Sequence, residues 1–294
     1  MQTRDLGATG QRSTVVTFGA IALNWLEQEG ANQLVELVLD HGVNHFDVAP
    51  TYGDAELKLG PKLRQYREEI FLGCKTQERS YEGAWKKLER SLDRLGVETI
   101  DLYQVHGLEY EHELETITDA DGALRAFREA QEQGLIDHIG LTSHGNPDLI
   151  LNAIEEIDDL DSLMFPLNPV VDAKDDAEYD YDAVLQRADQ EDIGTLAIKA
   201  FAKRSWPDTD ALPEHERPYA NWYEPVDDPE TIRNRLNYTL SRGVTSVLTP
   251  GDPKLVKMVL DAGDRFEELD EATQRAIVED ARHDESPVPE QLHH

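Results

Sequence analysis

The chain has 294 residues, 39% of them hydrophobic, and its 60 Asp and Glu outnumber its 28 Lys and Arg, which gives a formal net charge of -32. This excess of negative charge disfavours nucleic acid as a partner. No apolar run approaches the roughly 20 residues that a membrane helix needs, so we expect no contact with a membrane. The N-terminal MQTRDLGATG lacks the apolar segment of a secretion signal, and the cytoplasm is the expected location.

Apolar runs with strand character alternate with amphipathic segments along the chain. The predicted strands lie at 15–20, 43–47, 69–75, 100–106, 135–142, 162–167, 195–200 and 244–250. Helical spacing of apolar residues predicts helices at 31–42, 80–96, 120–134, 147–157, 181–190, 229–242 and 253–262. Strands that alternate with helices form parallel sheets, and eight such strands are the number that closes a (β/α)8 barrel.

The competing fold is an open, doubly wound sheet, which usually carries a GxGxxG loop after its first strand. The chain contains no GxGxxG, so we predict a single (β/α)8 TIM barrel over residues 1–285. The segment RDLGATGQRST predicts an N-terminal hairpin that closes the base of the barrel. An extra C-terminal helix is expected at 265–283 and a flexible tail at 286–294.

Polar side chains stand where predicted strands end, which is where barrels of this kind carry their active sites. Asp47 ends the second strand and Tyr52 lies in the loop beyond it. Lys75 ends the third strand and His106 the fourth. A neighbouring ammonium favours phenolate, so Lys75 would bring the pKa of Tyr52 closer to neutrality. Asp47 would orient Lys75, and His106 would hydrogen-bond a substrate carbonyl oxygen.

Four segments together resemble the aldo-keto reductase family over nearly the whole chain. They are VNHFDVAPTYGDAELKLG, FLGCKTQERSYEGAWKKLERSLDRLGVETIDLYQVHG, GLIDHIGLTSHG and GVTSVLTPGDPKLV. The resemblance implies an NAD(P)H-dependent reductase of aldehydes or ketones, of the carbonyl reductase or alcohol dehydrogenase type. It also implies a catalytic tetrad of Asp47, Tyr52, Lys75 and His106, with Tyr52 as the proton donor.

The resemblance also implies contacts to a nicotinamide cofactor, with NADP preferred and NAD as the alternative. Met164 stands where the family has a Gln, and Lys254 and Lys257 are candidate partners of a 2'-phosphate. The implied cofactor-binding residues are Gly19, Ala20, Thr142, Ser143, Asn168, Ile198, Lys199, Pro250, Gly251 and Lys254.

The connection at 201–228 is long and rich in aromatic residues, and long loops at a barrel mouth are usually functional. Its aromatic residues would either close over the cofactor and substrate or pack the loop against the barrel. The candidate substrate-pocket residues are Trp25, Trp206, Trp222 and Tyr223. No metal site is predicted, because the histidines lack ligand spacing and the single cysteine, Cys74, is a core residue.

Two other functions use the same fold. One is a nicotinamide-binding regulatory or sensory subunit with negligible turnover, and the other is a sugar-phosphate isomerase or aldolase, which does not need this tetrad. The abundance of acids, spread evenly along the chain, also resembles the proteins of halophilic archaea. It predicts an acidic surface that stays dispersed where salt screens its repulsion.

Overall fold

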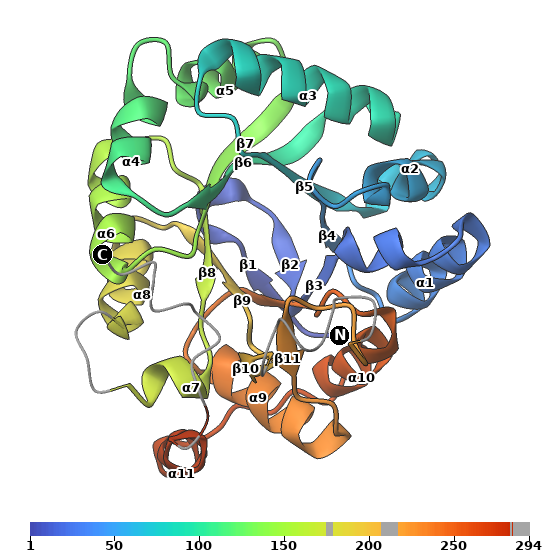
Figure 1. Cartoon of the computed structure of the whole chain (residues 1–294), viewed down its shortest axis with the longest axis vertical. Coiled ribbons are helices and arrows are strands. Elements are labelled where there is room, and N and C mark those ends of the chain that lie inside the picture. The colour runs from blue at the N-terminus through green and yellow to red at the C-terminus, as the bar shows by residue number, and fades with distance from the viewer. Residues whose placement is uncertain (175–178, 207–216, 283, 285–294) are drawn as a thin grey trace.

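The computed structural model describes residues 1–174, 179–206, 217–282 and 284. Eight parallel strands close a barrel in the order β12-β3-β4-β5-β6-β7-β8-β9, with helices around its outside (Figure 1). The predicted barrel and all eight predicted strands are confirmed. The strands are β3 (Val16–Gly19), β4 (His45–Asp47), β5 (Phe71–Thr76), β6 (Ile100–Leu108), β7 (Ile136–Ser143), β8 (Ser162–Pro166), β9 (Gly194–Ile198) and β12 (Ser246–Leu248).

All seven helices predicted from the apolar spacing are present; α8 has the predicted ends, and the other six differ from the predicted bounds by at most three residues at either end. They are α1 (Gln28–Asp40), α3 (Tyr81–Leu95), α5 (Ala123–Glu132), α6 (Pro147–Glu156), α8 (Tyr181–Gln190), α9 (Pro229–Ser241) and α10 (Pro253–Gly263). The structure adds helices that the sequence pattern did not predict. These are α2 (Ala55–Tyr66), α4 (Glu111–Thr118), α7 (Pro169–Asp172) and the short 3-10 helices η1 (Gly7–Thr9), η2 (Ala20–Trp25) and η3 (Arg67–Glu69).

Helix α3 shows how local sequence sets the bounds of these elements. At its start the Ser80 side chain accepts a hydrogen bond from the Gly83 amide at 3.3 Å, which satisfies one of the free donors of the first turn. At its end Gly96 adopts φ 67°, the left-handed conformation that glycine allows at low cost. Leu88 and Leu95 lie on one face and are buried, so the helix packs against the barrel through that face.

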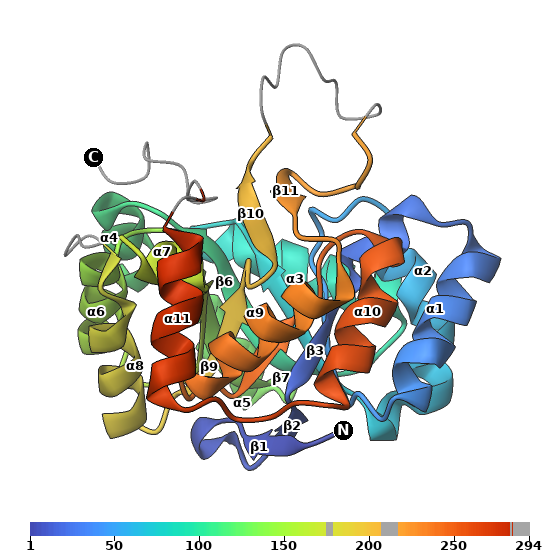
Figure 2. The ribbon, with the colours of Figure 1, turned by 90° about the horizontal axis from the view of Figure 1, so that it is seen from below.

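The predicted N-terminal hairpin closes the base of the barrel. Strands β1 (Thr3–Asp5) and β2 (Arg12–Thr14) pair antiparallel, at the end of the barrel opposite the strands β10 (Ala202–Ser205) and β11 (Tyr223–Pro225) (Figure 2). Leu6 is fully buried and packs in a small cluster inside the barrel with Leu102, Met164, Leu196 and Leu248. A Cβ at Gly194 would lie 2.5 Å from a Leu6 methyl, so glycine is needed there for the hairpin to pack against the barrel.

The connection at 201–228 contains a second hairpin. Strand β10 (Ala202–Ser205) pairs antiparallel with β11 (Tyr223–Pro225), and Glu224 forms ion pairs with Lys203 at 3.0 Å and Arg204 at 2.6 Å. Figure 2 shows this hairpin standing over the barrel. It brings the residues that follow 216 back to the mouth of the barrel.

The extra C-terminal helix is confirmed as α11 (Glu271–Ala281), which packs against α7 and α9. The Arg235 guanidinium donates to Asp284 at 2.7 Å and ties the end of α11 to α9. The predicted tail at 286–294 lies outside the described residues. Within the described part, no helix has the length and apolar character that crossing a bilayer requires.

Candidate active site at the barrel mouth

The four residues of the predicted tetrad line one cavity of about 260 Å³, called here the mouth cavity. Asp47 is the last residue of β4, Lys75 lies in β5 and His106 in β6. Because these strands are parallel neighbours, their carboxyl ends meet at the same edge of the barrel. Tyr52 reaches the same cavity from the turn that follows β4. The structure therefore brings together all four residues that the sequence singled out.

Lys75 and Asp47 form a buried ion pair between Nζ and Oδ2, with each side chain only 1% exposed. The second carboxylate oxygen of Asp47 accepts a hydrogen bond from Gln104 Nε2 at 3.1 Å. Burial raises the pKa of Asp47, and the charge of Lys75 and the hydrogen bonds from Lys75 and Gln104 oppose that rise. A Cβ at Gly73 would lie 3.3 Å from Asp47 Oδ1, so glycine leaves room for this pair.

Gln104 was not predicted from the sequence. It lies two residues before His106 in β6, and alternate residues of a strand point to the same face. That spacing could have identified Gln104 as a site residue, because it places the Gln104 amide inside the barrel, below His106. The contact with Asp47 fixes the carboxylate from the side opposite Lys75.

Tyr52 sits between the other members of the tetrad. Its ring lies edge-on to His106 with 5.9 Å between ring centroids, and Lys75 Nζ lies 5.9 Å from the Tyr52 ring centroid. Burial of the phenol, then the charge of Asp47, raise the pKa of Tyr52 well above its ordinary value. The expectation that the pKa of Tyr52 lies closer to neutrality is therefore wrong, because burial and the charge of Asp47 both raise it. Tyr52 keeps its proton at neutral pH.

His106 is neutral in this environment. Burial first, and the charge of Lys75 second, lower the pKa of His106 to about 2. Its Nδ1 atom is buried and has no hydrogen-bond partner among the described residues. A neutral imidazole can donate one hydrogen bond, which is what the polarisation of a carbonyl oxygen requires.

Most of the other predicted site residues line the mouth cavity as well. Those that do are Gly19, Trp25, Thr142, Ile198, Lys199, Trp222, Tyr223 and Gly251. Met164 also lines it, with its sulfur 3.9 Å from Lys75 Nζ. The cavity has further lining residues that the sequence did not single out, among them Ile21, His144, Asn221 and Thr249. His144 directly follows the predicted pair Thr142 and Ser143, whereas Asn221 arrives through the hairpin of β10 and β11, which local sequence does not reveal.

Six predicted residues lie outside the lining of the mouth cavity: Ala20, Ser143, Asn168, Pro250, Trp206 and Lys254. Ser143 Oγ donates to the Leu108 carbonyl at 2.7 Å. Asn168 Oδ1 caps α7 by accepting from the amides of Val170 and Val171 at 2.9 and 3.0 Å. Trp206 is buried and donates from Nε1 to the Asn221 carbonyl at 2.7 Å, so it packs the loop against the barrel. Internal hydrogen bonds thus occupy the polar side-chain atoms of Ser143, Asn168 and Trp206.

A second cavity of about 630 Å³ shares Trp25 and Ala220 with the first and is called the adjoining cavity. Lys254 lines it from the first turn of α10, and Arg217 lines it from the 201–228 connection. Lys257 does not line it and pairs instead with Asp261 at 2.7 Å. The adjoining cavity therefore presents two cations next to the start of a helix, one of which the sequence analysis had not singled out.

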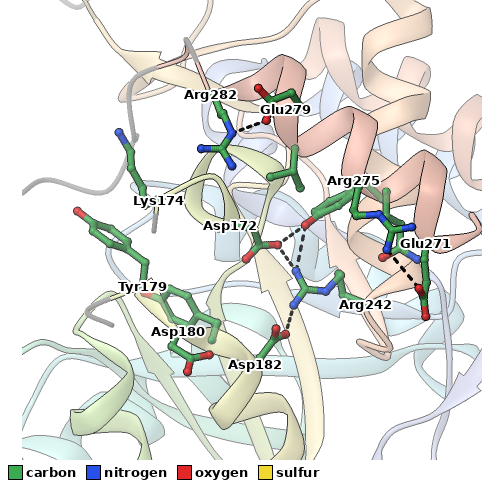
Figure 3. Close-up of a pocket in the computed structure, with 14 residues that line it drawn as sticks. Asp172, Lys174, Tyr179, Asp180, Asp182, Arg242, Glu271, Arg275, Glu279 and Arg282 are labelled. Atoms are coloured by element: carbon green, nitrogen blue, oxygen red, sulfur yellow. Dashed lines mark hydrogen bonds and ion pairs between the residues drawn. The ribbon is translucent and has the colours of Figure 1, made fainter. Parts of the chain in front are cut away.

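A cavity of about 740 Å³ lies between α7, α8, α9 and α11, and none of the predicted site residues lines it (Figure 3). Its charged side chains pair with one another. Arg242 contacts Asp172 and Asp182, and Arg275 contacts Glu271 at 3.3 Å. The Arg242 pairs join the end of α9 to α7 and α8, whereas the Arg275–Glu271 pair lies within α11, so we regard the cavity as structural. Among the described residues no group of His, Cys, Asp and Glu could hold a metal ion, and Cys74 is buried in the core as expected.

Sequence comparison identifies relatives over part of the chain. An uncharacterized oxidoreductase, YqkF, from Bacillus subtilis is 28% identical over 157 residues, which is 49% of both chains. The L-glyceraldehyde 3-phosphate reductase of Escherichia coli is 26% identical over 166 residues, covering 49% of this chain and 46% of that protein. The chain thus spans about half the length of these relatives.

Structural and family comparisons extend the match to most of the chain. The holo form of aldo-keto reductase AKR11C1 from Bacillus halodurans superposes with a TM-score of 0.73 at 22% identity, and all of both chains is covered. A putative aldo-keto reductase from Pseudomonas aeruginosa gives 0.65 at 23% identity, over 88% of this chain and 94% of the other. At these identities the likeness establishes the fold. The family model described as "Aldo/keto reductase family" matches residues 15–246, and the chain belongs to that family.

Proposed function

We propose that the protein reduces an aldehyde or ketone to an alcohol with hydride from NAD(P)H, as a carbonyl reductase. The observation that carries this proposal is the convergence of the tetrad on the mouth cavity, with a protonated Tyr52 between His106 and the Lys75–Asp47 pair. Family membership supports it, and so does the name of the Escherichia coli relative, which is a reductase of an aldehyde.

The residues of the two cavities fit a reduced nicotinamide dinucleotide. Asn221 lines the mouth cavity and its buried Nδ2 has no partner among the described residues, so it is available to a ligand carbonyl. Trp25 lies between the mouth cavity and the adjoining cavity, where Lys254 and Arg217 supply positive charge. Bound there, the cofactor would supply hydride to the substrate carbonyl carbon.

The protein's own groups would handle the proton. His106 donates a hydrogen bond to the carbonyl oxygen and aligns it, and Tyr52 transfers its phenolic proton to that oxygen as negative charge develops. The resulting phenolate lies near Lys75, whose charge stabilises it, and solvent returns the proton. Asp47 and Gln104 hold Lys75 in place. Because the raised pKa keeps Tyr52 protonated, the reduction has its acid available at neutral pH.

Titration with NADPH and NADH, followed by a screen of reactive aldehydes, tests the proposed function. We expect saturable binding of a reduced nicotinamide and aldehyde-dependent consumption of it. Binding without consumption would identify a regulatory or sensory subunit instead. We also place the protein in the cytoplasm, since its reductant is an intracellular cofactor.

We propose NADP as the preferred cofactor, with a 2'-phosphate bound in the adjoining cavity by Lys254 and Arg217. Lys254→Ala is expected to weaken NADPH binding by about 1 to 3 kcal/mol, the value of one charge-assisted contact, and to leave NADH binding nearly unchanged. Fluorescence titrations at one fixed salt concentration measure both effects. Lys257→Ala is the matched control, because Lys257 pairs with Asp261 on the same helix and should change neither affinity. Equal weakening of both cofactors by Lys254→Ala would contradict the phosphate contact.

We further propose that the acidic surface is an adaptation to high salt, as in halophilic archaea. The carboxylates that give the net charge of -32 repel one another at low ionic strength, and salt screens that repulsion. Melting temperature and turnover are therefore expected to rise from low salt to about molar KCl, where the screening length falls to about 3 Å. A flat or falling response over a KCl series would remove this proposal.

A further inference from the structure

Lys199, the residue after β9, has an unusual backbone. Its φ of 59° lies in the left-handed region that residues other than glycine rarely adopt. Two hydrogen bonds hold it there, because the Lys199 carbonyl accepts from the Ala202 amide at 3.0 Å and from Asn168 Nδ2 at 3.1 Å. Asn168 is itself fixed as the cap of α7. The fold therefore maintains a costly conformation at a residue that lines the mouth cavity, a pattern typical of functional sites.

None of the described residues supplies a counterion in contact with the ammonium of Lys199. The residue is only 6% exposed, and Nζ forms no hydrogen bond with any described residue. Nζ lies over the Trp222 ring at 4.5 Å from its centroid, a favourable but weak contact for a cation. Burying an ammonium without an acceptor is costly, so a ligand group that supplies one would bind favourably.

The charged groups around Lys199 leave it available. Glu109 acts on Lys199 through its charge but pairs with His144 Nδ1 at 3.6 Å, and no carboxylate of the described residues forms an ion pair with Lys199. Burial, then the charge of Lys199, lower the pKa of His144 to about 4, so His144 is neutral at pH 7. Burial lowers the pKa of Lys199 to about 7, with the charge of Glu109 opposing. An anion against Nζ would favour the charged lysine.

We propose that Lys199, which the family resemblance implied as a cofactor contact, instead binds an anionic group of the substrate, a carboxylate or a phosphate, so that the mouth cavity selects small aldehydes or ketones that carry such a group. This inference rests on the proposed function, since the carbonyl would lie at Tyr52 and His106 in the same cavity. The volume of about 260 Å³ suits a compact substrate. Trp222 would cover the anion-bearing end and exclude water from it.

The test compares matched substrates with and without the anion in the wild type, Lys199→Met and Lys199→Arg. The pairs are 4-oxobutanoate with its methyl ester, and glyceraldehyde 3-phosphate with glyceraldehyde, which distinguishes carboxylate from phosphate. Lys199→Met is expected to lower kcat/KM about 10- to 100-fold for the preferred anionic substrate, through a higher KM. It should change kcat/KM for the neutral member of the pair little. Lys199→Arg keeps the charge and should retain most of the preference. Melting temperature and NADPH affinity should stay near the wild-type values.

The pH profile gives a second readout that a merely structural role would not move. The lysine binds an anion only when charged, so kcat/KM for the preferred anionic substrate should fall as pH rises above about 7, the pKa of Lys199 in the free protein. The profile of the neutral substrate of the pair should not show this fall at high pH. In Lys199→Met the anionic and neutral profiles should become parallel.

Four outcomes would overturn the inference. If Lys199→Met slows both members of each pair and weakens NADPH, the lysine contacts the cofactor. If it changes neither kinetics nor the pH profile, the lysine binds no anion. Either result leaves the proposed carbonyl reduction standing, because the wild type still turns over. If the wild type reduces other aldehydes but neither anionic substrate, this inference fails and the proposed function stands; if it consumes NADPH with none of the aldehydes or ketones tested, both fail.

Discussion

Tyr52→Phe is expected to lower kcat for aldehyde reduction by about 10²- to 10⁴-fold, the usual cost of losing a positioned general acid. The change deletes one hydroxyl and leaves the ring in place against His106, so it opens no cavity. Because the proton transfer matters chiefly in the transition state, kcat and kcat/KM should fall together. Steady-state kinetics with a reactive aldehyde measure the effect.

Two controls make this result specific. NADPH affinity by fluorescence and the melting temperature should both match the wild type, since neither depends on the phenolic proton. A Phe variant that keeps more than about half the wild-type rate would exclude Tyr52 as the acid, because loss of a general acid costs far more.

Lys75→Met is expected to abolish most turnover and also to destabilise the fold by about 3 to 5 kcal/mol. The substitution leaves the Asp47 carboxylate buried without its ion-pair partner, and among the described residues only the Gln104 side chain remains to donate a hydrogen bond to it. It also removes the cation that stabilises the Tyr52 phenolate. Kinetics and denaturant unfolding measure the two losses separately.

A second variant separates charge burial from packing. Asp47→Asn in the Lys75→Met background removes the stranded charge, so the double variant should recover much of the stability and none of the activity. The loss of stability in Lys75→Met should also depend on pH. In Lys75→Met the pKa of Asp47 rises further in the folded state, so the deficit in stability should be largest above the ordinary pKa of an aspartate and shrink in acid. If Lys75→Met alone were as stable as the wild type at neutral pH, that result would contradict the predicted contribution of the buried ion pair to stability.

The strands and most helices were predictable because burial leaves a pattern in the sequence. Barrel strands are covered on both faces and appear as apolar runs, and the helices between them show apolar stripes bounded by caps such as Ser80 and Gly96. Helix α2 lacked a clear pattern because Pro61 lies inside it. Helix α4 is short, with only Leu114 and Ile117 buried. In these two, tertiary packing outweighs local preference.

The tetrad was predictable because strand ends meet at one mouth, so positions in the sequence translate directly into positions in space. Contacts that depend on tertiary packing were not. Arg217 reaches the adjoining cavity through the hairpin of β10 and β11, and Glu109 pairs with His144, so that Lys199 has no ion-pair partner within the described part of the chain. Asn168 also has a structural role that its sequence indicates, since Asn followed by Pro169 is a helix-start signal and its side chain caps α7.

The most direct measurement of the central claim is the stoichiometry of NADPH oxidation and alcohol formation when the wild-type protein is mixed with a reactive aldehyde. The account predicts aldehyde-dependent loss of the reduced-nicotinamide absorbance, with one alcohol formed for each NADPH oxidised. Saturable NADPH binding with no consumption across the aldehydes and ketones tested, and with NADH equally inert, would contradict it.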